Sequence, residues 1–144
     1  MEEKIRVLFI CIHNSARSQM AEEFLKNIGR NRFIVESAGF EPTEVNPLVV
    51  EVMKEEGIDL ANNKAKSLFK FFKEGRLYDY VITVCDDSTE KECPVFAGIA
   101  KRLHWPFPDP SALLGRNEEK KKEIRKIRDK IKSKIQSWVK ELNG

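Results

Sequence analysis

The segment Ile5-Arg-Val-Leu-Phe-Ile-Cys-Ile-His-Asn-Ser-Ala-Arg-Ser18 decides how the chain folds. Its first six residues form an apolar run that only Arg6 interrupts, which is typical of a buried β-strand. Beyond Ser18, apolar residues recur at helical spacing until Gly29, which predicts an α-helix that ends there. A strand, a polar loop and a helix in this order are typical of an α/β fold.

The remaining chain continues this alternation. We expect three further strands, at residues 33–36, 80–84 and 102–105. We expect a helix that Asn46 caps, with Pro47 in its first turn, and that ends at Gly57. Further helices are expected at residues 67–74 and toward the C-terminus, after a proline-rich ordered loop at 106–115. The apolar face of the C-terminal helix consists of Ile124, Ile127, Ile131, Ile135, Trp138 and Leu142.

These elements predict a three-layer α/β fold, with a four-stranded, mostly parallel sheet flanked by helices, in one domain over residues 1–144. Ligands of such sheets bind beyond the carboxyl ends of the strands. Cys11 follows the first predicted strand and Cys85 follows the third. We therefore expect both thiols at the edge of the sheet where chemistry occurs.

The loop after the first strand has the residues of an oxyanion site. Its backbone N–H groups can converge on one point beside the positive end of the following helix. The planar guanidinium of Arg17 can hold two oxygens of an oxyanion at once, and the same positive field favours the thiolate of Cys11. A thiolate beneath a bound oxyanion is placed for in-line attack. The predicted oxyanion-binding residues are Ile12, His13, Asn14, Ser15, Ala16, Arg17 and Ser18.

Other interpretations of these residues exist. Cys11 can be a buried cysteine at a strand end, and Arg17 a surface residue of a helix. We expect His13 to be structural or solvent-facing rather than catalytic. Asn14 tolerates a left-handed backbone and can lock the loop by hydrogen bonds, while the hydroxyl of Ser18 can donate to Cys11.

Composition limits the classes of protein. A chain of 144 residues, 41% of them hydrophobic, suits one domain with a buried core. No apolar run approaches the roughly 20 residues that span a membrane, and the first residues lack the order of a signal peptide. We therefore expect a cytoplasmic protein and a monomer, without a membrane partner, whose three cysteines stay reduced.

The charge is uneven along the chain. The net charge is +3, and residues 116–144 contain 11 lysines and arginines against 5 acidic residues. Because acidic residues are interleaved and no aromatic stacking platform accompanies them, we interpret this segment as a solvated helix face and expect no nucleic-acid partner.

At these residues the sequence resembles the low-molecular-weight protein tyrosine phosphatases and, among them, the thioredoxin-coupled arsenate reductases. The matching stretches follow the order of that family and cover nearly the whole chain. They are residues 11–22, 37–39, 45–47, 84–86, 93–94, 104–105 and 109–110.

The resemblance implies a mechanism. Cys11 would attack arsenate while Asp109 protonates a departing oxygen. Cys85 would then attack Cys11 and release arsenite, and Cys93 would attack Cys85 to leave a disulfide for thioredoxin to reduce. The family needs no metal and no bound organic cofactor for this reaction.

The residues support this relay independently. Reduction by thiols needs two cysteines, and passing the oxidation to the surface needs a third; the chain has three. Chance thiols remain an alternative, whereas the spacing of Cys85 and Cys93 does not match a zinc knuckle, so no metal site is predicted. Asp109, which precedes a proline, can also be a turn residue.

Two departures from the family bear on function. Ser111 stands where the tyrosine phosphatases usually have an aromatic residue, which favours reduction over hydrolysis of aryl phosphates through a phosphocysteine intermediate. Some of the reductases bind potassium near the loop, and Asn14, Glu22 and Ser37 match part of that site. The region expected to supply an acidic ligand reads Lys64-Ala-Lys-Ser67, so we do not expect the ion. A non-catalytic phosphate binder is a third hypothesis.

Overall fold

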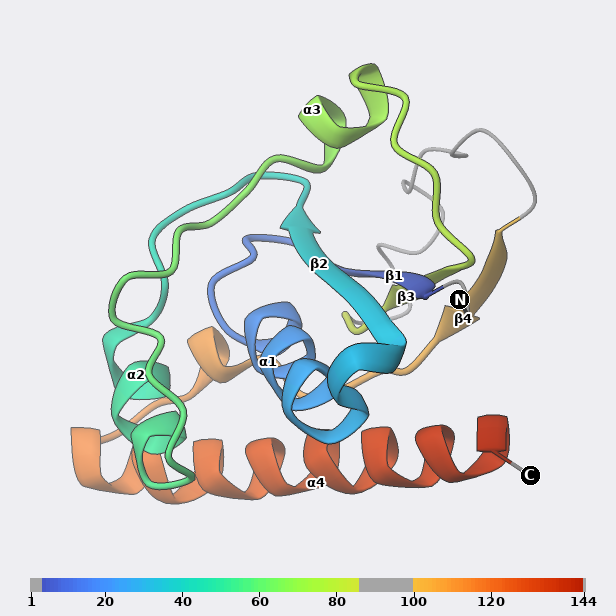
Figure 1. The fold of residues 1–144 in the computed structure, drawn as a ribbon. Helices are drawn as coiled ribbons and strands as arrows, with labels where there is room; N and C mark the ends of the chain where they lie inside the picture. The colour runs from blue at the N-terminus through green and yellow to red at the C-terminus, as the bar shows by residue number, and fades with distance from the viewer. Residues whose placement is uncertain (1–3, 86–99, 144) are drawn as a thin grey trace.

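The computed structural model describes residues 4–85 and 100–143 (Figure 1). Its described strands form one parallel sheet in the order β2-β1-β3-β4, which confirms the predicted four-stranded sheet. The strands are β1 (Ile5–Cys11), β2 (Phe33–Gly39), β3 (Tyr80–Thr83) and β4 (Lys101–His104). β2 extends three residues beyond its predicted end, because Ser37, Ala38 and Gly39 pair with the end of β1.

Two of the helices begin where the sequence provides capping side chains. The side chain of Asn46 accepts a hydrogen bond from Leu48 N at 2.9 Å, and that of Ser67 accepts one from Lys70 N at 3.3 Å. The helix after Asn46 ends at residue 54 instead of at the predicted Gly57, which lies in the following turn with φ +76°. The helices are α1 (Arg17–Gly29), α2 (Pro47–Lys54), α3 (Leu68–Lys73) and α4 (Asn117–Asn143).

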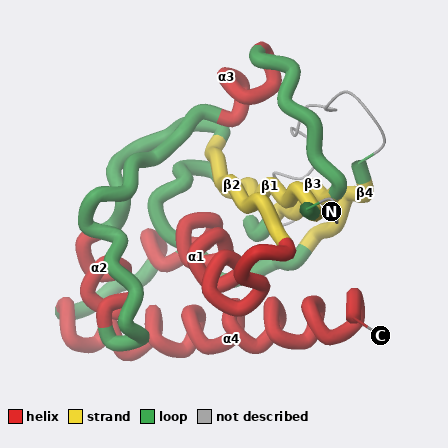
Figure 2. Tube along the Cα trace, in the orientation of Figure 1, coloured by secondary structure: helices red, strands yellow, loops and turns green. Residues whose placement is uncertain are grey.

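Side chains of β1 alternate between two cores. Val7 and Phe9 pack with α1, α2 and α4, whereas Leu8 and Ile10 pack with α3 on the other face of the sheet. Figures 1 and 2 show the resulting layers, with the long α4 running beneath α1. The predicted three-layer architecture is therefore present, and it leaves the carboxyl end of β1 pointing toward the loop that precedes α1.

The apolar face of α4 anchors the helix. Five of its six predicted residues, from Ile124 to Trp138, are buried, and Leu142 is partly buried at the end. Trp138 contacts the rings of Phe33, Tyr80 and Trp105. Among the described residues, no helix is both long and apolar enough to span a membrane.

Candidate active site

Cys11 is the last residue of β1, and the loop 12–16 leads from it to the first residue of α1, Arg17 (Figure 1). The thiol is 2% exposed and lies at the carboxyl edge of the sheet, as predicted. Both the strand register and the start of the helix fix its position, so the nucleophile candidate is held by regular structure on either side.

The peptide planes of the loop direct N–H groups toward the Cys11 sulfur. The carbonyls of Cys11, Ile12 and His13 accept hydrogen bonds from the backbone of residues 40–43 at 2.8–3.3 Å, and that of Ser15 accepts one from Asn46 N at 2.9 Å. In a trans peptide the next N–H points the opposite way. The N–H of Asn14 shows the result directly, because it lies 3.2 Å from the Cys11 sulfur. Such a concave row of N–H groups binds anions.

Asn14 locks this conformation. Its φ of +51° places it in the left-handed region that asparagine tolerates. Its side-chain amide is fully buried and donates to Ser18 Oγ at 2.7 Å and Ser37 Oγ at 2.9 Å. Its Oδ1 accepts from Gln19 Nε2 at 3.0 Å and from Lys66 N at 2.8 Å. The predicted locking role of Asn14 is thus visible in its contacts.

Hydrogen bonds favour the thiolate of Cys11. Burial opposes its ionisation, but hydrogen bonds from Cys85 and Ser18 and the charge of Arg17 outweigh that cost and lower the pKa of Cys11 from 9.0 to about 6. The Cys11 sulfur lies 2.8 Å from Ser18 Oγ. A thiol with this pKa is largely thiolate near neutral pH, and the thiolate is the nucleophilic form.

Cys85 brings a second thiol to the same place. It follows β3, is fully buried, and its sulfur lies 3.4 Å from the carbonyl oxygen of Ile10. Cys11 and Cys85 are not joined to each other by a disulfide bond in the structure. Cys93, the third predicted relay cysteine, lies outside the described residues.

Arg17 and Asp109 meet at the rim of the loop. The Arg17 guanidinium donates to the carbonyl of Phe107 at 3.0 Å, and its other terminal nitrogen lies 3.8 Å from Asp109 Oδ2. Arg17 is buried, whereas 28% of the Asp109 side chain is exposed. A buried cation and a partly exposed carboxyl group at one mouth suit oxyanion binding and proton transfer, respectively.

His13 stands apart from this chemistry. Its Nδ1 lies 3.0 Å from the carbonyl oxygen of Glu41, so the ring fastens the loop to the neighbouring segment. This contact agrees with the structural role expected for His13.

The residues around Glu22 do not fit a bound potassium ion. Lys66 Nζ lies 3.0 Å from Glu22 Oε1, and Lys26 Nζ lies 2.5 Å from Oε2, so two ammonium groups already contact this carboxylate. A further cation there would meet like charges rather than an added acidic ligand. Within the described ranges, no group of three or more His, Cys, Asp or Glu residues is arranged to hold a metal ion.

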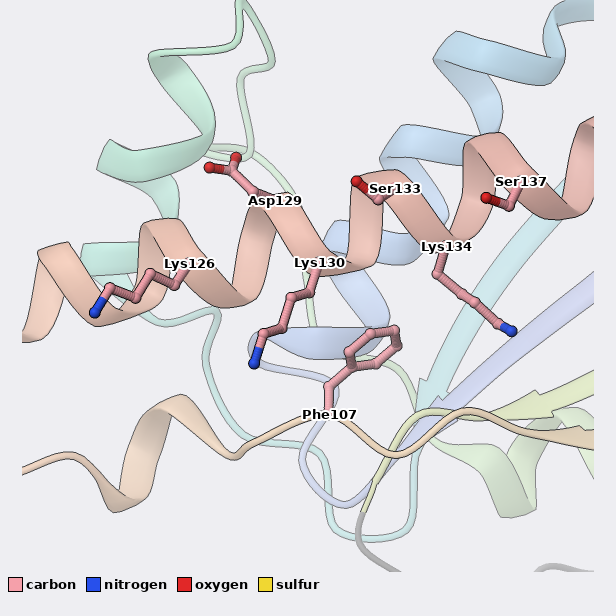
Figure 3. A pocket seen from close by; sticks show the side chains of 7 residues that line it. All are labelled: Phe107, Lys126, Asp129, Lys130, Ser133, Lys134 and Ser137. Atoms are coloured by element: carbon pink, nitrogen blue, oxygen red, sulfur yellow. The ribbon is translucent and has the colours of Figure 1, made fainter.

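Figure 3 shows a hollow between Phe107 and side chains of α4. It encloses about 710 Å³. The lining residues are Phe107, Lys126, Asp129, Lys130, Ser133, Lys134 and Ser137. Since they include no thiol and no residue of the Cys11 loop, we place the chemistry at the loop and not in this hollow.

Several supporting residues escaped the sequence analysis. Gly39 packs so closely on the loop that an added Cβ would lie 2.7 Å from both Asn14 N and Ile12 O. Gln19 donates to the carbonyl of Lys64 at 3.1 Å as well as to Asn14. Gly39 lies in the stretch 37–39 that resembles the family, but no local sequence pattern indicated a role for Gln19.

Comparison with known proteins agrees with this geometry. The family model of low molecular weight phosphotyrosine protein phosphatase matches residues 6–144. The chain is 37% identical over 139 residues to the arsenate reductase of Bacillus subtilis, covering 96% of this chain and 97% of that one.

Solved structures give the same result. The arsenate reductase of Archaeoglobus fulgidus aligns with a TM-score of 0.73 at 27% identity, over 92% of this chain and 98% of that chain. A thioredoxin-dependent arsenate reductase of Corynebacterium glutamicum aligns with a TM-score of 0.64 at 32% identity, over 94% of this chain and 63% of that chain.

Proposed function

The chain belongs to the low molecular weight phosphotyrosine protein phosphatase family, and from that premise we propose that it reduces arsenate to arsenite through three cysteines that thioredoxin regenerates. The observation that carries the proposal is a second buried thiol at the active-site loop: Cys85 lies close enough to Cys11 to help lower the pKa of Cys11. A phosphatase that passes a phosphoryl group from one cysteine to water needs only the first thiol. A reductase must supply two electrons and needs the second.

The first step joins substrate and enzyme. Arsenate binds to the N–H groups of the loop and to the guanidinium of Arg17, which balance its charge. The thiolate of Cys11 attacks arsenic, and a sulfur–arsenic bond replaces an arsenic–oxygen bond. Asp109 donates a proton to the departing oxygen, which leaves as water.

The second step transfers the electrons. The thiolate of Cys85 attacks the sulfur of Cys11, so that a disulfide forms and the sulfur–arsenic bond breaks. The bonding pair stays on arsenic, which leaves as arsenite. The position of Cys85 supports this step, because the attack needs neighbouring sulfurs: the Cys85 sulfur contacts the carbonyl of Ile10, the residue before Cys11, and Cys85 helps to lower the pKa of Cys11.

The third step restores Cys11. Cys93 attacks the sulfur of Cys85, which frees Cys11 as a thiolate and leaves a Cys85–Cys93 disulfide. The dithiol of thioredoxin reduces that disulfide and is itself oxidised, so the overall reaction consumes one thioredoxin dithiol for each arsenate. We expect no metal and no bound organic cofactor, and we expect the enzyme to work as a cytoplasmic monomer.

A coupled assay tests the proposal. With arsenate, thioredoxin, thioredoxin reductase and NADPH, we expect steady NADPH oxidation by the wild type and none above background by Cys85→Ser or Cys93→Ser. Without thioredoxin, the wild type should release about one arsenite per enzyme and stop, because Cys85 and Cys93 remain oxidised.

Hydrolysis of an aryl phosphate provides the control. The loop that receives arsenate also fits phosphate, so weak hydrolysis is expected to persist in Cys93→Ser, whose substitution leaves the loop untouched. Rapid aryl phosphate hydrolysis that survives both substitutions, with no arsenate-dependent NADPH loss in the wild type, would instead establish the phosphatase alternative. Phosphate binding with neither activity would identify a binder.

A further inference from the structure

Lys66 places an ammonium group on the buried side of the oxyanion loop. Its Nζ lies 3.0 Å from Glu22 Oε1, and its backbone N–H donates to Asn14 Oδ1 at 2.8 Å. We propose that Lys66 is a positioning residue, a partly buried cation that holds the loop in its anion-binding conformation through Glu22. The proposal rests on the proposed oxyanion function of the loop and extends it to a residue outside the loop.

A directed chain of hydrogen bonds links Glu22 to the nucleophile. An ionised carboxylate only accepts, so Ser37 must donate its proton to Glu22 Oε1. Ser37 Oγ then accepts from the amide of Asn14, whose second N–H donates to Ser18 Oγ. The oxygen of Ser18 is thereby occupied as an acceptor, and its own proton is directed to the sulfur of Cys11, 2.8 Å away.

The charge on Glu22 sets the direction of this chain, and its burial makes that charge costly. Glu22 is only 4% exposed. A buried carboxylate needs cations and hydrogen-bond donors to replace its lost hydration. Without the ammonium of Lys66, Glu22 Oε1 would keep only the hydrogen bond from Ser37, and the first link of the hydrogen-bond chain would be weakened.

Two lysines neutralise Glu22, but they contact different oxygens. Lys26, one turn along α1, contacts Oε2 at 2.5 Å and also approaches Glu23 Oε1 at 3.9 Å. Lys66 contacts Oε1, the same oxygen that accepts from Ser37. Lys66 therefore acts on the hydrogen bond that leads to Cys11, whereas Lys26 is shared with a second carboxylate.

Alkylation of Cys11 by iodoacetamide as a function of pH, followed by mass spectrometry of the Cys11 peptide, tests the proposal. Lys66→Met removes the ammonium and keeps most of the chain length. Lys64→Met is the matched control, because Lys64 is exposed and no described contact involves its side chain. We expect Lys66→Met to lower the alkylation rate of Cys11 near pH 6.5 about tenfold. We also expect it to weaken, about tenfold, the protection of Cys11 from alkylation by inorganic phosphate. Lys64→Met should match the wild type.

Chemical rescue separates positioning from a merely structural role. We expect propylammonium to restore the alkylation rate of Lys66→Ala, and tetramethylammonium, which has no N–H donor, to fail at equal ionic strength. Lys66→Arg should retain most of the wild-type rate. The proposal is wrong if Lys66→Met matches Lys64→Met, or if its loss follows thermal unfolding and neither arginine nor propylammonium restores it.

These measurements do not involve arsenate reduction, so the two proposals can fail separately. If the wild type shows no NADPH-coupled turnover but Lys66→Met still shows the expected loss of Cys11 alkylation, the reductase proposal alone is overturned. Absence of phosphate protection in the wild type would overturn the oxyanion site, while the alkylation profile would still decide the role of Lys66.

Discussion

Two carboxylates of this protein are each held between two cations, with different consequences. Glu22 lies buried on α1 between Lys26 and Lys66. Glu55 follows α2 and contacts Arg125 and Arg128 of α4 at 2.9 Å each, with 42% of its side chain exposed. Hydrogen bonds from Arg125 and Arg128 lower the pKa of Glu55 to about 2.

The next hydrogen bond beyond each ion-pair cluster explains the difference. Glu22 also accepts from Ser37, which leads through Asn14 to the candidate nucleophile. Arg128, beside Glu55, instead donates to the carbonyl of Val52 on α2 at 2.9 Å. The first cluster organises a reactive loop, whereas the second joins two helices. The number of ion pairs does not distinguish the clusters; burial and the onward hydrogen bond do.

Glu22→Gln should produce the largest effect. The amide keeps the shape but removes the carboxylate that Lys26 and Lys66 contact, and it can present an N–H to Ser37. We expect the free energy of unfolding in urea to fall by about 3 kcal/mol and arsenate turnover to fall at least about tenfold. A loss of under about 1 kcal/mol with normal turnover would mean that this buried cluster behaves like an exposed one.

The sequence predicted the parts of this comparison that depend on neighbours along the chain. Cys11, the left-handed Asn14 and the contact of Ser18 with the thiol follow from one short segment between a strand and a helix. The predicted cap at Asn46 was equally local, and the helix expected over residues 67–74 begins next to the cap residue Ser67. Periodicity and short-range hydrogen bonding carry such information.

Ser18→Ala should have an intermediate effect, on pH dependence. Hydrogen bonds hold the folded-state pKa of Cys11 at about 6, below its ordinary 9.0. Ionisation of Cys11 therefore stabilises the fold fully above pH 9, and this contribution disappears as the pH falls through about 6. Without the hydroxyl, the inflection of Cys11 alkylation should move upward by about one pH unit.

The alkylation rates of Cys11 in wild type and in Ser18→Ala should converge above pH 9, where Cys11 is ionised in both proteins. The measurement is the iodoacetamide rate of the Cys11 peptide across this range. An unchanged inflection would show that Ser18 Oγ accepts a proton from the thiol instead of donating one to the thiolate.

The supporting contacts from distant segments could not be predicted. Lys66 meets Glu22 across 44 positions, and residues 40–43 meet the loop through backbone groups that any sequence possesses. The sequence suggested that residues 64–67 supply no acidic ligand for potassium, but not that the ammonium of Lys66 would contact Glu22. Gly39 is needed because of a close approach that only the folded chain creates. Such contacts depend on how β2 and the segment before α3 are brought beside the loop.

Glu55→Gln should have the smallest effect. Because Glu55 itself is 42% exposed, and the buried Arg128 also donates to the Val52 carbonyl and to Asp129, we expect the free energy of unfolding in urea to fall by at most about 1 kcal/mol, and by less at high salt. The low pKa of Glu55 means that its contribution is present above pH 4.5 and disappears toward pH 2, so wild type and variant should converge in acid. Arsenate turnover should stay at the wild-type level, since Glu55 has no described contact with the Cys11 loop. A turnover loss as large as that of Glu22→Gln would show that α2 and α4 communicate with the site, and that burial alone does not separate the two clusters.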